Sequence, residues 1–156
     1  MAKKMGAGHI VVFTTHPEKR DAALRLGADE VVDSRNPAAM RKHHRSLDCI
    51  LSTVPVPFDP QPYFRTLRRR GTMTVMALLG PYEKTFNNFE LAVAGLSLNG
   101  SMIGSIDDTR ESLAFCLEHD ILPEVEVIDA SPNSINAAME RLRQADVRFR
   151  FVIKMK

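Results

Sequence analysis

The residues best suited to binding a ligand follow a short β-branched segment near the start of the chain. The segment His9 to Thr14 predicts a buried strand, and Thr15, His16, Lys19 and Arg20 come directly after it. Dinucleotide folds that select NAD end this strand with an acid, which binds the ribose 2′-hydroxyl. Hydroxyl and cationic donors in its place favour the 2′-phosphate of NADP.

Two interpretations of this segment stay open from the residues alone. Thr15 or His16 can cap a helix while Lys19 and Arg20 form its solvated face, or the same residues can bind a phosphate. Glu18 is the acid in this stretch. We expect it in the first helical turn, where it favours the helix dipole and faces solvent.

Other reactive residue types point to no chemistry. His43 and His44 are adjacent, so on a helix they diverge by about 100° and make a poor metal site. We expect a solvated helix end there and at the arginine run 68–70. Ser52 and Thr53 have no neighbouring base in the sequence. We therefore predict no catalytic residue and no metal ligand.

Strand-like and helix-like segments alternate along the chain. Pro17 and Gly27 suit the start and stop of the first helix, and Asn36 suits the cap of the second. Such alternation predicts βαβ units and an α/β, doubly wound parallel sheet. Strands are expected at 10–14, 30–33, 47–54, 72–78, 96–103, 124–128 and 148–153, and helices at 17–27, from 36, 62–69, 87–94, from Asp107 or Asp108 to 119, and 131–144.

The sequence shows no match to the N-terminal motif of a dinucleotide-binding fold. Such folds begin with a strand and a Gly-rich turn, whose amides meet the pyrophosphate. Residues 1–7 instead suggest the tail of a helix that Gly6 ends. We therefore expect the chain to enter the fold within the first crossover helix, without the first strand and its turn. The neighbouring strands would then flank a gap, which either closes or takes another segment.

Several segments together resemble the zinc-dependent medium-chain alcohol dehydrogenases, in particular their cinnamyl-alcohol-dehydrogenase-like branch. The order and spacing of these segments match over essentially the whole chain, which identifies the C-terminal, nucleotide-binding portion of that family. The segments are Val12 to Arg20, Leu24 to Asp29, Thr53 to Pro55, Gly100 to Ser105 and Asp146 to Val152.

The resemblance implies a Rossmann-like domain that binds NADP(H), with the adenosine phosphate on Thr14, Thr15, His16, Lys19 and Arg20. It further implies that Thr53, Ala77, Ser101, Met102 and Ile103 lie along the rest of the cofactor, although Ala77 stands where the family usually has glycine. The family's zinc ligands and proton relay would all precede residue 1.

Composition limits the partners and the compartment. The chain has 156 residues, is 44% hydrophobic and carries a net charge of +2, which argues against nucleic acid as a partner. No apolar run reaches the ~20 residues of a membrane span. Cys49 and Cys116 lie inside apolar runs in no metal spacing, so we expect buried, reduced thiols and a cytoplasmic protein. We expect one domain over 1–156, with 146–156 a C-terminal strand returning to the catalytic domain.

Two functional hypotheses follow. The first is the cofactor-binding part of an NADP(H)-dependent, zinc-dependent alcohol dehydrogenase or aldehyde reductase, a chain expected to be inactive alone. The alternative is a non-catalytic dinucleotide-binding or dimerisation module. The predicted strand 96–103 has no charge and no proline, so it lacks the features that prevent edge pairing. This edge, like the resemblance, predicts a homodimer.

Overall fold

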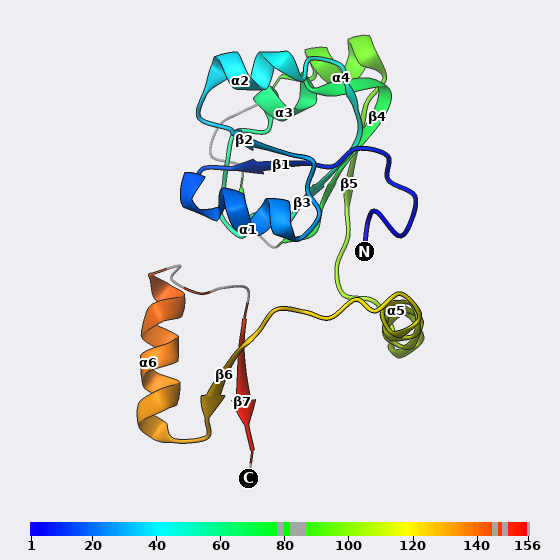
Figure 1. Cartoon of the computed structure of the whole chain (residues 1–156). Helices are drawn as coiled ribbons and strands as arrows, with labels where there is room; N and C mark the ends of the chain where they lie inside the picture. Colours follow the sequence, from blue (N-terminus) through cyan, green and yellow to red (C-terminus); the bar gives the residue numbers. More distant parts are fainter. Residues whose placement is uncertain (78–79, 82–86, 145–146, 148–149, 156) are drawn as a thin grey trace. The chain divides into compact units, whose positions relative to one another are not determined.

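The computed structural model describes residues 1–77, 80–81, 87–144, 147 and 150–155 (Figure 1). The chain forms two compact units, Met1–Asp108 and Thr109–Lys156. Each unit contains parallel strands joined by helical crossovers, as the alternating pattern predicts. The ten predicted site residues all belong to the first unit.

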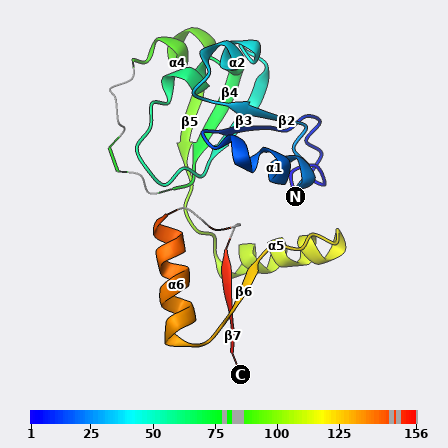
Figure 2. The same cartoon turned by 60° about the vertical axis from the view of Figure 1, so that its left-hand side comes forward.

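In the described part of the first unit, five strands form two parallel groups (Figure 2). The strands β1 (Val11–Thr14) and β2 (Glu30–Asp33) pair with each other, which confirms that the first two strands are neighbours. The strands β3 (Leu47–Ser52), β4 (Leu67–Val75) and β5 (Ser97–Gly100) form the second group, in that order. Parallel pairing brings the carboxyl ends of the strands in each group to one edge.

Helices cover both sides of β1 and β2, as a doubly wound fold requires. The short turn η1 (Pro17–Lys19) leads into α1 (Arg20–Arg25), and α2 (Pro37–Lys42) lies on the opposite side of the pair (Figures 1 and 2). The Asn36 side chain caps α2 by accepting from the N–H groups of Ala38 and Ala39 at 3.0 and 3.2 Å. Gly27 follows α1 with φ +99°, which confirms its predicted stop.

The core of the first unit lies between β3–β5 and two short helices, α3 (Gln61–Phe64) and α4 (Phe89–Ala94). Ile50, Phe64, Leu67 and Met73 form its buried cluster. Ile50 and Met73 come from neighbouring strands and face the same side of the sheet. This packing fixes β3 and β4 in register and therefore fixes the ends from which the site residues extend.

Among the described residues, β1 and β3 do not pair, so the ladder is interrupted where the absent first strand was expected. Neither predicted outcome, closure or a filling segment, is seen. An aromatic contact links the two groups instead, because the Phe13 ring of β1 meets the Tyr63 ring of α3 edge-on at 5.5 Å. His43 also lies edge-on to Phe13 at 6.1 Å. It is buried, which corrects the solvated end expected for it, whereas His44 is exposed as predicted.

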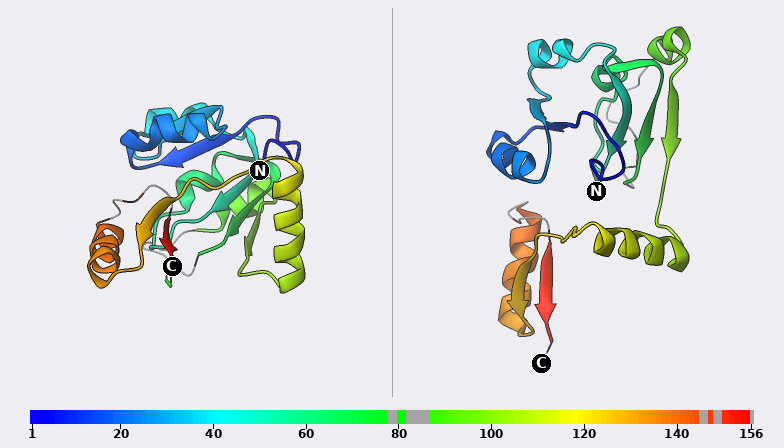
Figure 3. Two further views of the ribbon diagram at one scale, coloured as in Figure 1. Left: turned by 60° about the horizontal axis from the view of Figure 1, so that its bottom comes forward. Right: turned by 45° about the vertical axis from the view of Figure 1, so that its right-hand side comes forward.

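The second unit is built around a βαβ crossover. It contains β6 (Glu126–Asp129), α6 (Pro132–Arg143) and β7 (Phe151–Lys154), with α6 beside the strand pair (Figure 3). The Arg141 guanidinium bridges to the Glu126 carboxylate at 2.8 Å and lies 4.9 Å from the centre of the Phe151 ring. These contacts join one helix to both strands.

Three local predictions are wrong at element ends. The helix expected over 62–69 stops at Phe64, and the arginine run 68–70 belongs to β4, exposed on a strand rather than at a helix end. Helix α5 (Ile106–Glu118) starts before Asp107, because Ser105 caps it. The Ser105 hydroxyl accepts from the Asp108 N–H at 3.1 Å, while the Asp108 carboxylate accepts from the Ser105 N–H at 2.6 Å. Residues 148–149 of the last predicted strand lie outside the described residues.

Cys49 is exposed rather than buried, which corrects the prediction for this thiol. Its side chain alternates with Ile50 along β3, so it faces the side of the sheet opposite the buried cluster. A strand of a complete doubly wound sheet is buried on both faces and therefore has a continuous apolar sequence. The apolar sequence around Cys49 fits that pattern, so it did not indicate that one face of β3 is exposed. Cys116 is half-buried.

We expect Cys49 to react with a thiol reagent in the native chain much faster than Cys116, because a solvated thiol is accessible without unfolding. The single-thiol variants Cys116→Ser and Cys49→Ser, each treated with Ellman's reagent in native buffer, separate the two rates. A Cys49 thiol that reacts only after denaturant is added would show that this face of β3 is covered.

Candidate nucleotide-binding edge

The predicted site residues lie at the carboxyl ends of strands in two separate parallel groups. The segment from Thr14 to Arg20 follows β1, Thr53 follows β3, Ala77 follows β4 and Ser101 follows β5. Open parallel sheets bind ligands at this edge. Within β3–β5, the backbone ladder continues past the strands: the Met76 N–H donates to the Ser52 carbonyl, and the Ser101 N–H donates to the Val75 carbonyl, both at 2.9 Å.

The turn after β1 is organised by its own polar groups. The Thr14 hydroxyl accepts from the His16 N–H at 3.0 Å, which turns the chain away from the strand. His16 stands at the N-cap of η1, yet its side chain makes no capping hydrogen bond. Its ring instead meets Glu18, with Nδ1 2.9 Å from Oε1. The capping alternative therefore has no support from the side chains of this turn.

Lys19 and Arg20 have different surroundings. Lys19 is exposed at the end of η1. The Arg20 Nη1 donates to the Val31 carbonyl at 2.9 Å, which ties the start of α1 to β2. Arg20 thus has a structural contact that the sequence did not indicate, and Lys19 is the more available cation for a ligand.

Glu18 places a negative charge beside this segment. It lies in the first turn and its side chain is 66% exposed, as predicted. The pKa of its carboxyl is lowered, mainly because its own backbone N–H donates to it and then because His16 does. Glu18 is therefore ionised at neutral pH and opposes a phosphate bound nearby.

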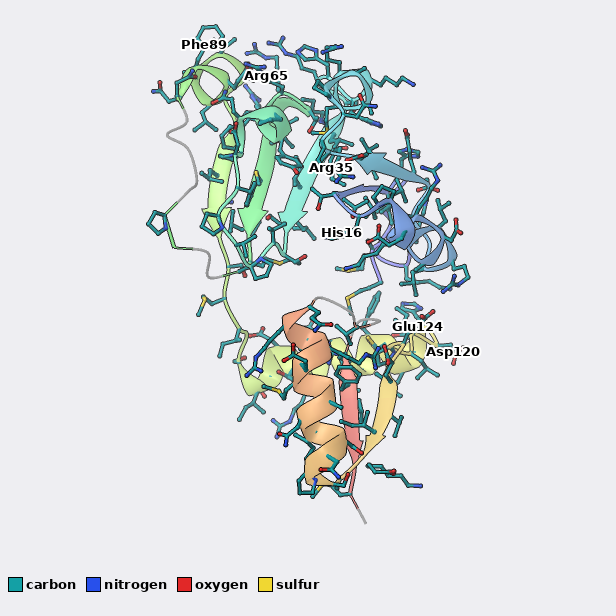
Figure 4. The ribbon with its side chains drawn as sticks, turned by 90° about the vertical axis from the view of Figure 1, so that its left-hand side faces the viewer. His16, Arg35, Arg65, Phe89, Asp120 and Glu124 are labelled. Carbon is teal, nitrogen blue, oxygen red and sulfur yellow. The ribbon has the colours of Figure 1, made fainter. Side chains whose placement is uncertain are left out.

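Arg35 is a candidate site residue that the sequence interpretation missed. It follows β2, beside the Thr14 turn, and the Ser34 N–H donates to the Thr14 carbonyl at 3.0 Å. Figure 4 shows Arg35 near His16. The pKa of its guanidinium is raised, first by hydrogen bonds to Asp33 and then by that residue's charge, with a further contribution from Glu18. Its position two residues after a strand was the available signal.

The remaining predicted residues follow the strands of the second group, β3–β5. Thr53 is exposed and Ala77 is half-buried at the ends of two adjacent strands. Ser101, Met102 and Ile103 leave β5 exposed, and the Ile103 side chain is 92% accessible. Exposed apolar side chains of this size suit contact with a ligand or with another polypeptide surface.

A metal centre is not found in the part of the chain that the structure describes. No three His, Cys, Asp or Glu residues among the described ones are grouped so as to hold a metal ion. A search of the described helices for a membrane-spanning candidate also finds none. The described residues therefore do not fit a zinc site.

Comparison with known proteins identifies the family of the chain. The family model described as zinc-binding dehydrogenase matches residues 1–118. The chain belongs to the zinc-binding dehydrogenase family. This confirms the resemblance inferred from the sequence. The chain is 45% identical over 153 residues to the aldehyde reductase YahK of Escherichia coli, and 39% identical to an NADP-dependent alcohol dehydrogenase C of Mycolicibacterium smegmatis.

Solved structures agree with the α/β assignment. A cinnamyl alcohol dehydrogenase of Sorghum bicolor superposes with a TM-score of 0.90 at 34% identity, over 99% of this chain and 44% of that one. One from Helicobacter pylori, solved with NADP(H), gives 0.81 at 29% identity, over 99% of this chain and 43% of that one. The match to each bacterial relative named above covers 98% of this chain and 43% of the relative, so the chain spans less than half their length.

Arg20 and Lys19 provide a test of this division of roles. We expect Arg20→Ala to lower the free energy of unfolding by about 1 kcal/mol, because the Val31 carbonyl loses its charged donor. Lys19→Ala should change it by less than about 0.5 kcal/mol, as for other surface substitutions. Urea unfolding followed by circular dichroism measures both. Equal effects of the two substitutions would refute the assignment of Arg20 to the fold.

Proposed function

We propose that this chain is the NADP(H)-binding part of an alcohol dehydrogenase or aldehyde reductase. The observation that carries the proposal is the turn after β1, where hydroxyl and cationic side chains stand at a ligand-binding edge. The relatives support it, since they include an aldehyde reductase and an NADP-dependent alcohol dehydrogenase.

The adenosine 2′-phosphate would bind at the Thr14 to Arg20 segment. Thr15, His16 and Lys19 are exposed there and offer donors to an anion. Arg35 adds a second cation at the end of β2. Phosphates bound by charged donors gain the stronger class of hydrogen bond. Glu18 opposes this attraction, and so does the Asp33 carboxylate, which accepts from Arg35. The preference for NADP over NAD therefore depends on Lys19 and Arg35 outweighing these two carboxylates.

The rest of the cofactor would extend along the strand ends towards β5. Thr53, Ala77 and the run Ser101 to Ile103 lie in that direction within one parallel group. The relatives are more than twice as long as this chain. We propose that zinc and the acid–base groups belong to the region of the relatives that this chain does not match. We accordingly propose that hydride transfer belongs to the whole protein, in which residues 1–156 form the nucleotide-binding domain and the C-terminal strand returns to the catalytic domain.

The cofactor preference is measured by fluorescence titration with NADPH and NADH. We expect the chain to bind NADPH more tightly, and Lys19→Glu to remove the difference because the charge beside the phosphate is reversed. Glu18→Gln should lower the Kd for NADPH several-fold, because removing an exposed repulsive charge changes the binding free energy by about 1 kcal/mol or less. Arg25→Ala, on the helix that follows this turn, is the control and should leave the preference for NADPH unchanged.

Two results would contradict the 2′-phosphate assignment. The first is tighter binding of NADH than of NADPH by the parent chain. The second is an unchanged preference in Lys19→Glu, which would place the phosphate elsewhere.

We further propose a cytoplasmic homodimer that pairs through residues 96–103. The supporting observation is that β5 is an edge strand of its sheet. Its exposed residues, Ser97, Asn99 and Gly100, carry no charge that would repel a second copy. Two copies related by a two-fold axis can extend the sheet through this edge. A dimerisation module without catalysis is the alternative function that the same edge favours.

A lysine at Asn99 tests the dimer. Asn99 is exposed, whereas Leu98 packs against the core cluster, so Asn99→Lys perturbs the edge without disturbing the core. Analytical ultracentrifugation at tens of micromolar should show a dimer for the parent and a shift to monomer for Asn99→Lys. Asn136→Lys on α6 should leave the dimer intact. A parent chain that sediments as a monomer would refute edge pairing.

A further inference from the structure

A groove of about 230 Å³ lies between α2 and α3, apart from the nucleotide-binding edge. Its polar lining comes from Ser34, Arg41 and His44 on one side and from Arg65 on the other. Its apolar lining consists of Pro37, Met40 and Pro62. The predicted cofactor residues do not line it. Ser34, at one end, is the residue that connects the groove to the Thr14 turn through the backbone.

Basic side chains are concentrated around this groove. Arg41 and His44 lie one turn apart on the exposed face of α2 and the turn after it, opposite Arg65. The Arg45 N–H donates to the Arg65 carbonyl at 3.0 Å, so the backbone after α2 is tied to the residue that follows α3. The net charge of the whole chain is only +2, so the positive charge around the groove reflects the local arrangement of its residues.

One carboxylate partly offsets this charge. Glu90 of α4 accepts from the Arg65 Nε at 3.1 Å. In Figure 4, Arg65 is labelled near Phe89, which directly precedes Glu90. This contact uses Nε, and a guanidinium has further N–H donors on its two terminal nitrogens. Arg65 can therefore keep Glu90 and still bind an anion.

We propose that the α2–α3 groove is a second anion site, which binds a phosphate monoester that carries a small apolar group. Two arginines from facing helices match the geometry of a phosphate, because each guanidinium can donate two parallel hydrogen bonds. Met40 is buried at 6% exposure and, with the two prolines, offers an apolar surface to the organic part. The volume is below the roughly 300–1,000 Å³ of pockets for larger ligands, so the group is small.

The probes are phenyl phosphate, inorganic phosphate and phenol, titrated into the ¹⁵N-labelled chain and followed by NMR. We expect phenyl phosphate to bind most tightly, inorganic phosphate more weakly and phenol not measurably, with shifts at residues 40–45 and 62–65. Arg41→Ala should weaken phenyl phosphate about tenfold or more, as for loss of a charge-assisted hydrogen bond. Glu90→Gln should tighten it.

Lys42→Ala is the matched control. Lys42 carries the same charge on the same helix but points about 100° away and does not line the groove, so its loss should weaken binding less than about threefold. Equal weakening by Arg41→Ala and Lys42→Ala would reduce the effect to general electrostatics and overturn the site. Loss of binding in Lys19→Glu would assign the ligand to the nucleotide-binding edge instead. Thermal unfolding of each variant confirms that the fold is retained.

Discussion

The backbone ladder of β3, β4 and β5 extends one residue beyond the strands at their carboxyl ends. The Met76 N–H bonds to the last residue of β3, and the Ser101 N–H bonds to the last residue of β4. Main-chain pairing therefore holds Ser101 and the residue before Ala77 in line with the strands. The buried contact of Ile50, Phe64, Leu67 and Met73 keeps that ladder in register. The candidate site therefore depends on the parallel pairing of β3–β5 and on the buried cluster that packs against these strands.

Charge at the β1 end of the edge is divided between structural and binding contacts. Arg20 ties α1 to β2, and Asp33 holds Arg35 through hydrogen bonds at 3.1 and 3.2 Å. Lys19 is an exposed cation at the end of η1, and in the proposed function it meets the phosphate. The nearby Glu18 carboxylate means that selectivity for a 2′-phosphate is a balance of a few exposed charges, which screening by salt will reduce.

Local signals in the sequence predicted the elements well. Asn36 and Gly27 mark helix ends because capping and a positive φ are properties of one or two residues. The predictions for His43 and Cys49 were wrong because the surroundings of these residues come from distant segments. His43 is buried against Phe13, and Cys49 is exposed on the face of β3 opposite the buried cluster. Nothing in the sequence indicated that Arg20 contacts a carbonyl eleven residues away. The candidate site at the strand ends follows from the inferred parallel order. Arg35, two residues after β2, carried the same positional signal and was overlooked.

The most direct test is amide chemical-shift mapping of NADPH on the ¹⁵N-labelled chain, with NADH as the comparison. The proposed function predicts shifts at 14–20, 34–35, 53 and 101–103, with the largest NADPH-specific changes at Thr15, His16 and Lys19, and none along α6. Shifts confined to α6 and β6, or identical shifts for both nucleotides at 14–20, would contradict recognition of a 2′-phosphate at the end of β1.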